Sequence, residues 1–111
     1  MEDNSQPELI NRISAIFPEF RTEWLADTAG EVLPSTSLHS VYQSFLPWVS
    51  SAELSAKQLA ALAKLLDSEV AAGGDRENAV STCFLEHCGQ VGLTRRLSPL
   101  LGAASRSKLH A

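Results

Sequence analysis

The stretch SAKQLAALAKLLDSEVAAGG, Ser55 to Gly74, decides the fold class of this 111-residue chain. Ser55 followed three residues later by Gln58 is the capping-box pattern of a helix start, and a Gly-Gly pair is typical of a helix end. Between these signals the apolar residues recur at spacings of three and four, the helical period: Leu59, Leu62, Ala63, Leu66 and Val70. The sequence therefore predicts one amphipathic helix here.

The same period continues toward the N-terminus, and no sustained strand alternation interrupts it. We predict a helix over residues 5–17 that ends at Pro18, a second helix over residues 18–30, and a short helix over residues 38–46 that Pro47 stops. Toward the C-terminus, Gly and Pro separate further short helical segments. The chain is expected to be all-α, a single compact bundle of about five to seven short helices.

Composition bounds the class of protein. A hydrophobic content of 44% in 111 residues suits one core, so residues 1–111 are predicted to form a single helical domain, with residues 1–6 and 107–111 as flexible ends. Thirteen acidic against nine basic residues give a charge of -4, which argues against nucleic acid as a partner. The acidic start MEDNSQPELI lacks the features of a secretory signal, and no run of about 18 apolar residues occurs. We expect a cytoplasmic protein without a membrane partner.

The stretch ENAVSTCFLEHC, Glu77 to Cys88, holds the highest density of reactive side chains. We predict that Asp75 caps this segment as one helix running to about Gly89. On a continuous helical wheel, one broad apolar face carries Val80, Cys83, Phe84, His87 and Cys88, with His87 near its centre. The prediction is a core helix with these side chains packed inward, which leaves Asn78 and Glu86 for a neighbouring loop or for solvent.

Two kinds of chemistry could use the side chains of this stretch. Cys83 and His87, at i and i+4, could ligate one metal ion with Glu86 or Cys88. Structural zinc needs four ligands, however, and the remaining histidines, His39 and His110, are expected in a short helix and at the very C-terminus. A Cys83 nucleophile with His87 as its base needs a partly exposed thiolate. Because burial of Cys83 and His87 favours a structural role for them, we expect no metal, no cofactor and no catalytic residue. An enzyme that uses Cys83 and His87 is the third functional hypothesis.

Charge is distributed unevenly along the chain. Residues 1–31 hold seven acids and two arginines, a net of -5, whereas the last 17 residues hold four basic residues and no acid, a net of +4. The basic tail is predicted to complement helix dipoles or to pair with the acidic N-terminal region. Four of the acids are spaced by four and form a carboxylate stripe within the second helix and just past its end: Glu19, Glu23, Asp27 and Glu31. Such like charges weaken an isolated helix, and a cationic partner would gain electrostatic steering from them.

The C-terminal two fifths of the chain, from LLDSEV onward, carry a resemblance. A Gly-Asp turn leads to Asn78-Ala79-Val80 and Phe84-Leu85-Glu86, and a Leu-Gly-x-x-Ser-Arg element follows at Leu101-Gly102 and Ser105-Arg106. This pattern resembles a group of small bacterial all-helical proteins that are similar to the immunity proteins of polymorphic-toxin and secreted-effector systems. The resemblance implies a helical fold in which the motif residues are architectural, and a function in binding one cognate toxin. Cys83 and His87 are not part of the pattern.

These observations lead to a functional hypothesis and an alternative. The leading hypothesis is an immunity protein that neutralises a cognate toxin, most simply a nuclease-type effector, by occluding its basic active-site cleft. The alternative is a non-enzymatic adaptor or chaperone-like module that binds partners through an apolar groove. For the leading hypothesis, the residues expected to contact the toxin are the stripe and one aromatic anchor: Glu19, Glu23, Trp24, Asp27 and Glu31.

Overall fold

The computed structural model describes residues 5–27 and 38–109. Within these ranges the chain forms seven α-helices and one 3-10 helix, η1, and no strand, which confirms the predicted all-α fold. The elements are α1 (Ser5–Ile16), α2 (Pro18–Asp27), α3 (Leu38–Ser51), α4 (Ala56–Ala72), α5 (Gly74–Cys83), η1 (Leu85–Val91), α6 (Thr94–Leu97) and α7 (Ala103–Arg106).

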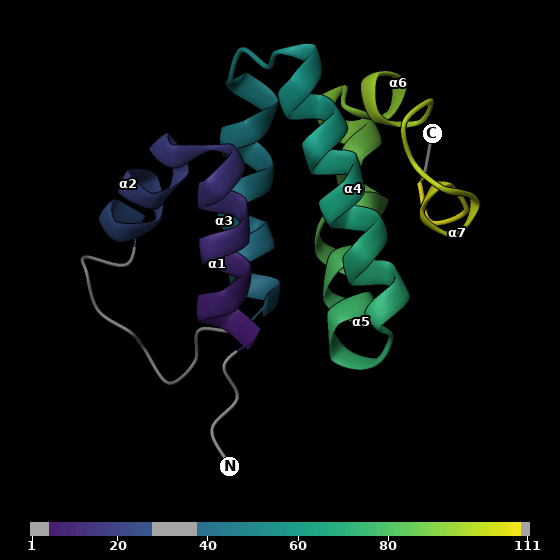
Figure 1. Ribbon diagram of the computed structural model, residues 1–111, viewed down its shortest axis with the longest axis horizontal. Helices are drawn as coiled ribbons and strands as arrows, with labels where there is room; N and C mark the ends of the chain where they lie inside the picture. Colours follow the sequence, from purple (N-terminus) through teal and green to yellow (C-terminus); the bar gives the residue numbers. More distant parts are fainter. Residues whose placement is uncertain (1–4, 28–37, 110–111) are drawn as a thin grey trace.

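The longer helices form the body of the molecule, and the short C-terminal helices lie against one side of it (Figure 1). Helix α3 packs on α1, α2 and α5, while α4 packs on α1 and α5. Helices α6 and α7 contact α4, at the opposite edge of this view from α2. Among the described helices, none is both long enough and apolar enough to cross a membrane.

An aromatic cluster at the meeting point of α1, α2, α3 and α5 forms the centre of the core. Phe45 on α3 lies among four other rings, with centroid distances of 5.0 to 6.2 Å. Those rings are contributed by the end of α1, by α2, by α3 itself and by the residue after α5: Phe17, Phe20, Trp48 and Phe84. Because Phe20 is fully buried in this cluster, α2 is held firmly against the rest of the domain.

Gly73 joins α4 to α5 without an intervening loop. The capping box at the start of α4 is present as predicted, with the Ser55 and Gln58 side chains each accepting from the backbone N–H of the other residue. At the other end, Gly73 has φ +70°, a conformation that favours glycine, and its N–H donates to the Val70 carbonyl. Gly73 also precedes α5 directly, so the prediction that Asp75 caps this helix was wrong: Asp75 lies inside the first turn.

Pro47 lies inside α3, so the prediction that this residue stops the helix was wrong. A proline removes one backbone hydrogen bond, here the one that the Gln43 carbonyl would accept. Both Pro47 and Gln43 are exposed, so the unpaired carbonyl can be solvated. Beyond Pro47 the helix continues because Val49 is fully buried on its inner face. The rule that proline ends a helix fails here for two reasons. The carbonyl that loses its hydrogen bond faces water, and the turn after Pro47 still contributes a residue to the core.

Asp67 fixes the C-terminal helix α7 to α4. Its carboxylate accepts from the Gly102 N–H, with its two oxygens at 3.0 and 3.1 Å, and from the Ser105 hydroxyl at 2.5 Å. A Cβ at position 102 would lie 3.4 Å from the Asp67 carboxylate, an ordinary van der Waals contact, so the attachment depends on the backbone N–H and not on the lack of a side chain. The Leu-Gly-x-x-Ser-Arg element noted in the sequence therefore has an architectural role, as its backbone and serine bind the carboxylate of the LLDSEV segment.

Glu69 joins three helices through a buried carboxylate. Its Oε2 atom accepts from Arg12 of α1 at 2.9 Å and from Arg76 of α5 at 3.2 Å, while the side chain itself is 1% exposed. Arg76 also bridges to Glu8 at 2.8 Å. The buried Tyr42 hydroxyl faces the same carboxylate, and burial, followed by the charge of Glu69, raises the pKa of Tyr42. This ionic clamp ties α1, α4 and α5 together.

Candidate functional site

Helix α2 presents the described part of the acidic stripe to solvent. Glu19 and Glu23 are exposed one helical turn apart, and we call these two residues the acidic face of α2. Arg21 donates to Asn11 Oδ1 at 2.7 Å, a contact with α1. Asp27 ends the described part of α2 without a described side chain, and Glu31 lies outside the described residues. The structure thus brings two of the four predicted stripe carboxylates together on one surface.

Trp24 lies on the opposite side of α2 from this face. Its side chain is 8% exposed, and its ring packs on that of Phe20 at 6.5 Å. Trp24 therefore belongs to the core, where it helps to hold α2 in place, and its ring would reach a partner only after α2 had moved. The acidic face is thus the outer side of a helix whose inner side is buried through Phe20 and Trp24.

The predicted inward face of the Glu77–Cys88 stretch is correct for Cys83, Phe84 and Cys88, which are buried, and wrong for His87, which is exposed. Helix α5 ends at Cys83, and Phe84 has φ -127° and ψ -67°, outside the α-helical region. The chain then continues as the 3-10 helix η1, in which successive side chains turn by about 120° rather than 100°. A single α-helical wheel cannot place residues beyond this break, and His87 turns outward.

Cys83 contacts a different histidine from the one considered in the sequence. His39 Nδ1 on α3 lies 2.9 Å from Cys83 Sγ, and Gln43 Nε2 lies 3.9 Å from the same atom. His39 lies 44 positions and Gln43 lies 40 positions from Cys83 in the sequence, so no local spacing could indicate these contacts. Burial raises the pKa of the Cys83 thiol, the Gln43 contact opposes this, and the charge of Glu86 adds to it.

Cys88 is the more deeply buried thiol. Its Sγ donates to the Phe84 carbonyl at 3.3 Å, and burial raises its pKa to about 12. A thiolate is the nucleophilic form of cysteine. With raised pKa values both thiols stay protonated at neutral pH, which favours a packing role for them. Among the described residues, no group of three or more His, Cys, Asp or Glu side chains could hold a metal ion.

We expect both thiols to resist a thiol-reactive dye in the native protein at pH 8 and to react together after denaturation. The cause is the combination of burial and raised pKa at Cys83 and Cys88. The measurement is the absorbance of released thionitrobenzoate with time, with and without denaturant. Single Cys83→Ser and Cys88→Ser variants identify which thiol reacts. Rapid labelling of Cys83 in the native protein would contradict the packing role and would indicate that Cys83 and His39 form a reactive pair.

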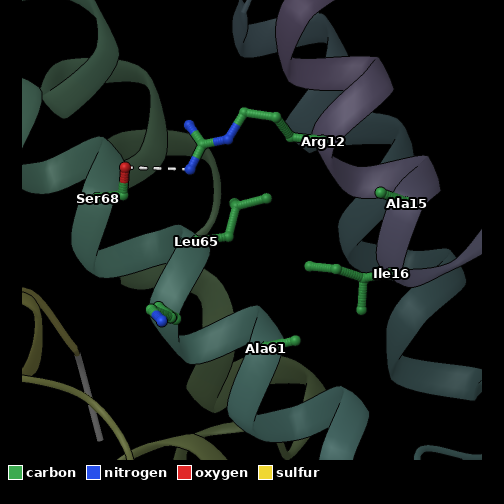
Figure 2. Close-up of a pocket in the computed structure, with 7 residues that line it drawn as sticks. Arg12, Ala15, Ile16, Ala61, Leu65 and Ser68 are labelled. Carbon is green, nitrogen blue, oxygen red and sulfur yellow. Dashed lines mark hydrogen bonds between the residues drawn. The ribbon is translucent and has the colours of Figure 1, made fainter.

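A groove runs between α1 and α4 on the surface of the bundle. Figure 2 shows Arg12 reaching from α1 toward Ser68 on α4, with Leu65 and Ile16 between the two helices. Arg12 Nη2 donates to Ser68 Oγ at 3.0 Å. The pocket has a volume of about 410 Å³, and a second hollow of about 240 Å³ continues it along the same helices.

This α1/α4 groove has an apolar floor and a basic edge. Ala15, Ile16 and Ala61 line both hollows, and lysines stand beside each of them. The lysines are Lys57 and Lys64, and Gln58 fixes one end by donating to the Ile16 carbonyl at 3.3 Å. Small side chains on facing helices leave the space open. The groove can take an apolar side chain, and its edge favours a partner segment with negative charge.

Comparison with protein-family models, with curated proteins and with solved structures gave no match to this chain. The functional argument therefore rests on the surfaces described above: an acidic face on α2 and an apolar, basic-edged groove between α1 and α4.

Proposed function

We propose that this chain is an immunity protein that binds and neutralises a cognate bacterial toxin in the cytoplasm, with the acidic face of α2 meeting the basic cleft of the toxin. The observation that carries the proposal is the state of the α2 carboxylates. Within residues 5–27 and 38–109, the salt bridges use Glu8, Glu69 and Glu77, and none uses Glu19 or Glu23. These two exposed charges are therefore available to a partner.

The way α2 is held adds a second argument. Phe20 and Trp24 anchor the helix in the aromatic cluster, so its carboxylates are presented on a fixed surface. A preorganised charged surface loses less conformational freedom on binding than a mobile one. A nuclease-type toxin has a basic cleft because its substrate is a polyanion, and an acidic inhibitor both accelerates encounter and blocks the path of the phosphates.

The test uses the purified chain and the product of the adjacent gene. Reversal of both charges, Glu19→Lys with Glu23→Lys, is expected to slow association about tenfold or more at low salt, because rim charges act mainly on the association rate. Surface plasmon resonance at several salt concentrations measures the rate, and a growth assay with the toxin measures protection. The matched control is Glu53→Lys, an exposed acid on the connection between α3 and α4. Absence of a complex, or equal rates for both variants, would contradict the proposal.

The α1/α4 groove favours a second candidate, an adaptor-type module that captures an apolar side chain of a partner segment. Ala61 lines both hollows of the groove, so Ala61→Phe would fill it. In the same binding experiment, loss of binding by Ala61→Phe together with weak salt dependence would identify this mode. Loss on charge reversal together with strong salt dependence identifies the electrostatic inhibitor.

A further inference from the structure

Two lysines stand along one edge of the α1/α4 groove, and neither is paired within the described part of the chain. Lys57 lines one hollow and Lys64 lines the other, and both are exposed residues of α4. The salt bridges among the described residues use the basic side chains of Arg12, Arg76 and Lys108. In a chain with a net charge of -4, this groove is thus bordered by positive charge that no described carboxylate neutralises.

The spacing of the two lysines gives the groove a defined geometry. Lys57 and Lys64 are seven residues apart, which places them on one face of α4, two turns from each other. A rise of about 1.5 Å per residue separates their Cα atoms by about 10 Å along the helix axis. Ala61 lies between them on the same face and lines both hollows. Along α4 the groove therefore has an apolar centre with one ammonium group on either side.

The floor of the groove leaves apolar surface uncovered. Figure 2 shows Ile16 of α1 and Leu65 of α4 pointing into the space between the two helices. Ala15 and Ala61 lie beside them, each with a side chain of one methyl group, and neither alanine is buried. Covering such a floor with an apolar side chain releases water from it and stabilises a complex. The two hollows thus offer room for large apolar side chains of a partner.

The described surface of the chain itself offers no segment that matches this groove. Leu100 is the exposed large hydrophobic side chain of the described residues, and the charged residues nearest to it in the sequence, Arg96 and Arg106, are basic. A second copy that inserted Leu100 would bring these arginines toward Lys57 and Lys64, where like charges repel. Charge complementarity instead favours a different protein, one in which carboxylates flank an apolar residue.

We infer that the α1/α4 groove binds an amphipathic helix of a partner protein in which two carboxylates, seven residues apart, flank an apolar side chain. The carboxylates pair with Lys57 and Lys64, and the apolar side chain fills the hollows over Ala61. A helix laid along α4 matches the site because its own rise repeats the spacing of the lysines. The inference rests on the second candidate function, the adaptor-type module, and not on the acidic face of α2.

The test is an NMR titration of the whole ¹⁵N-labelled chain with designed peptides. The probe is an alanine-based helical peptide of about 16 residues, with two glutamates seven residues apart and leucine at the third and fourth positions after the first glutamate. Three matched peptides carry lysine for both glutamates, alanine for both leucines, or glutamates five residues apart. We expect saturable shifts of the Ile16, Ala61 and Leu65 amides with the probe, and binding at least about fivefold weaker with each matched peptide.

Charge reversal on the protein makes the test specific. Lys57→Glu with Lys64→Glu is expected to weaken binding of the probe about tenfold or more and to restore binding of the lysine peptide. Both positions are exposed, and a glutamate at position 57 lies in the first turn of α4, where it suits the helix dipole. The matched control, Arg95→Glu with Arg96→Glu, makes the same change in net charge at exposed positions of α6 and is expected to leave the affinity unchanged. The NMR spectrum verifies that each variant folds.

Several results would overturn the inference. Absence of saturable shifts at the groove amides would do so, as would equal affinity for the glutamate and lysine peptides. Equal weakening by the two double variants would show that the peptide responds only to net charge. Concentration-dependent shifts of the same amides without peptide would identify a second copy as the occupant, and tighter binding of octanoate would identify a small amphiphile. Because no toxin is present, these results are independent of whether the acidic face of α2 binds one.

Discussion

Replacing Phe45 by alanine is expected to lower the free energy of unfolding by about 4 kcal/mol. Phe45 is fully buried, and its ring contacts those of Phe17, Phe20 and Phe84. Truncation removes apolar burial from four elements at once and leaves a cavity that rigid helices cannot close. Because small domains are stable by about 5–15 kcal/mol, this loss brings the protein close to unfolding.

Urea denaturation followed by circular dichroism measures the effect of Phe45→Ala. Phe45→Leu, which leaves a smaller cavity, is expected to cost less than Phe45→Ala. The surface control is Leu100→Ala, since Leu100 is 45% exposed and its truncation is expected to cost less than about 0.5 kcal/mol. A cost for Phe45→Ala no greater than that of Leu100→Ala would show that the aromatic cluster is not the centre of the core.

The second large effect is expected at Glu69. Glu69→Ala removes the carboxylate to which Arg12 and Arg76 donate, and leaves both guanidinium groups without that acceptor. Breaking a buried ion pair from one side costs about 3–5 kcal/mol. The arginine side chains are 31% and 23% exposed and can turn toward water, so we expect a loss of about 3 kcal/mol, at the lower end of that range.

Glu8 supplies a matched control because it binds the same arginine from the surface. Its side chain is 53% exposed, and Glu8→Ala is expected to cost less than about 1 kcal/mol. The comparison of both variants in chemical denaturation isolates the contribution of burial. Equal costs for Glu69→Ala and Glu8→Ala would mean that the clamp contributes no more than an ordinary surface ion pair.

Local patterns predicted the elements of this fold well where the rule depended on neighbouring residues. The capping box at Ser55 and the helix end at Gly73 are both present, and they set the boundaries of α4. Two predictions failed because packing outweighed a local rule: α3 continues through Pro47, and the break at Phe84 turns His87 outward. In each case the deciding contact is with a helix distant in the sequence.

The polar contacts between elements were harder to predict, because their partners are distant in the sequence. The carboxylates Asp67 and Glu69 carry no distinguishing pattern in the sequence, yet one fixes α7 and the other joins three helices. Lys108 of the basic tail pairs with Glu77, and in the described part of the chain no tail residue forms a salt bridge with an acid of the N-terminal region. Only tertiary structure brings partners of this kind together.

The single-residue connection at Gly73 has a consequence for how the chain folds. Helices α4 and α5 lie next to each other in sequence and in space, so docking them closes almost no loop and costs little chain entropy. Bringing α1 onto α4, by contrast, requires closure over α2 and α3. We expect the α4–α5 hairpin to assemble first and to serve as the template on which the N-terminal helices dock, so substitutions at its interface should slow folding, while those at the α1 contacts should chiefly speed unfolding.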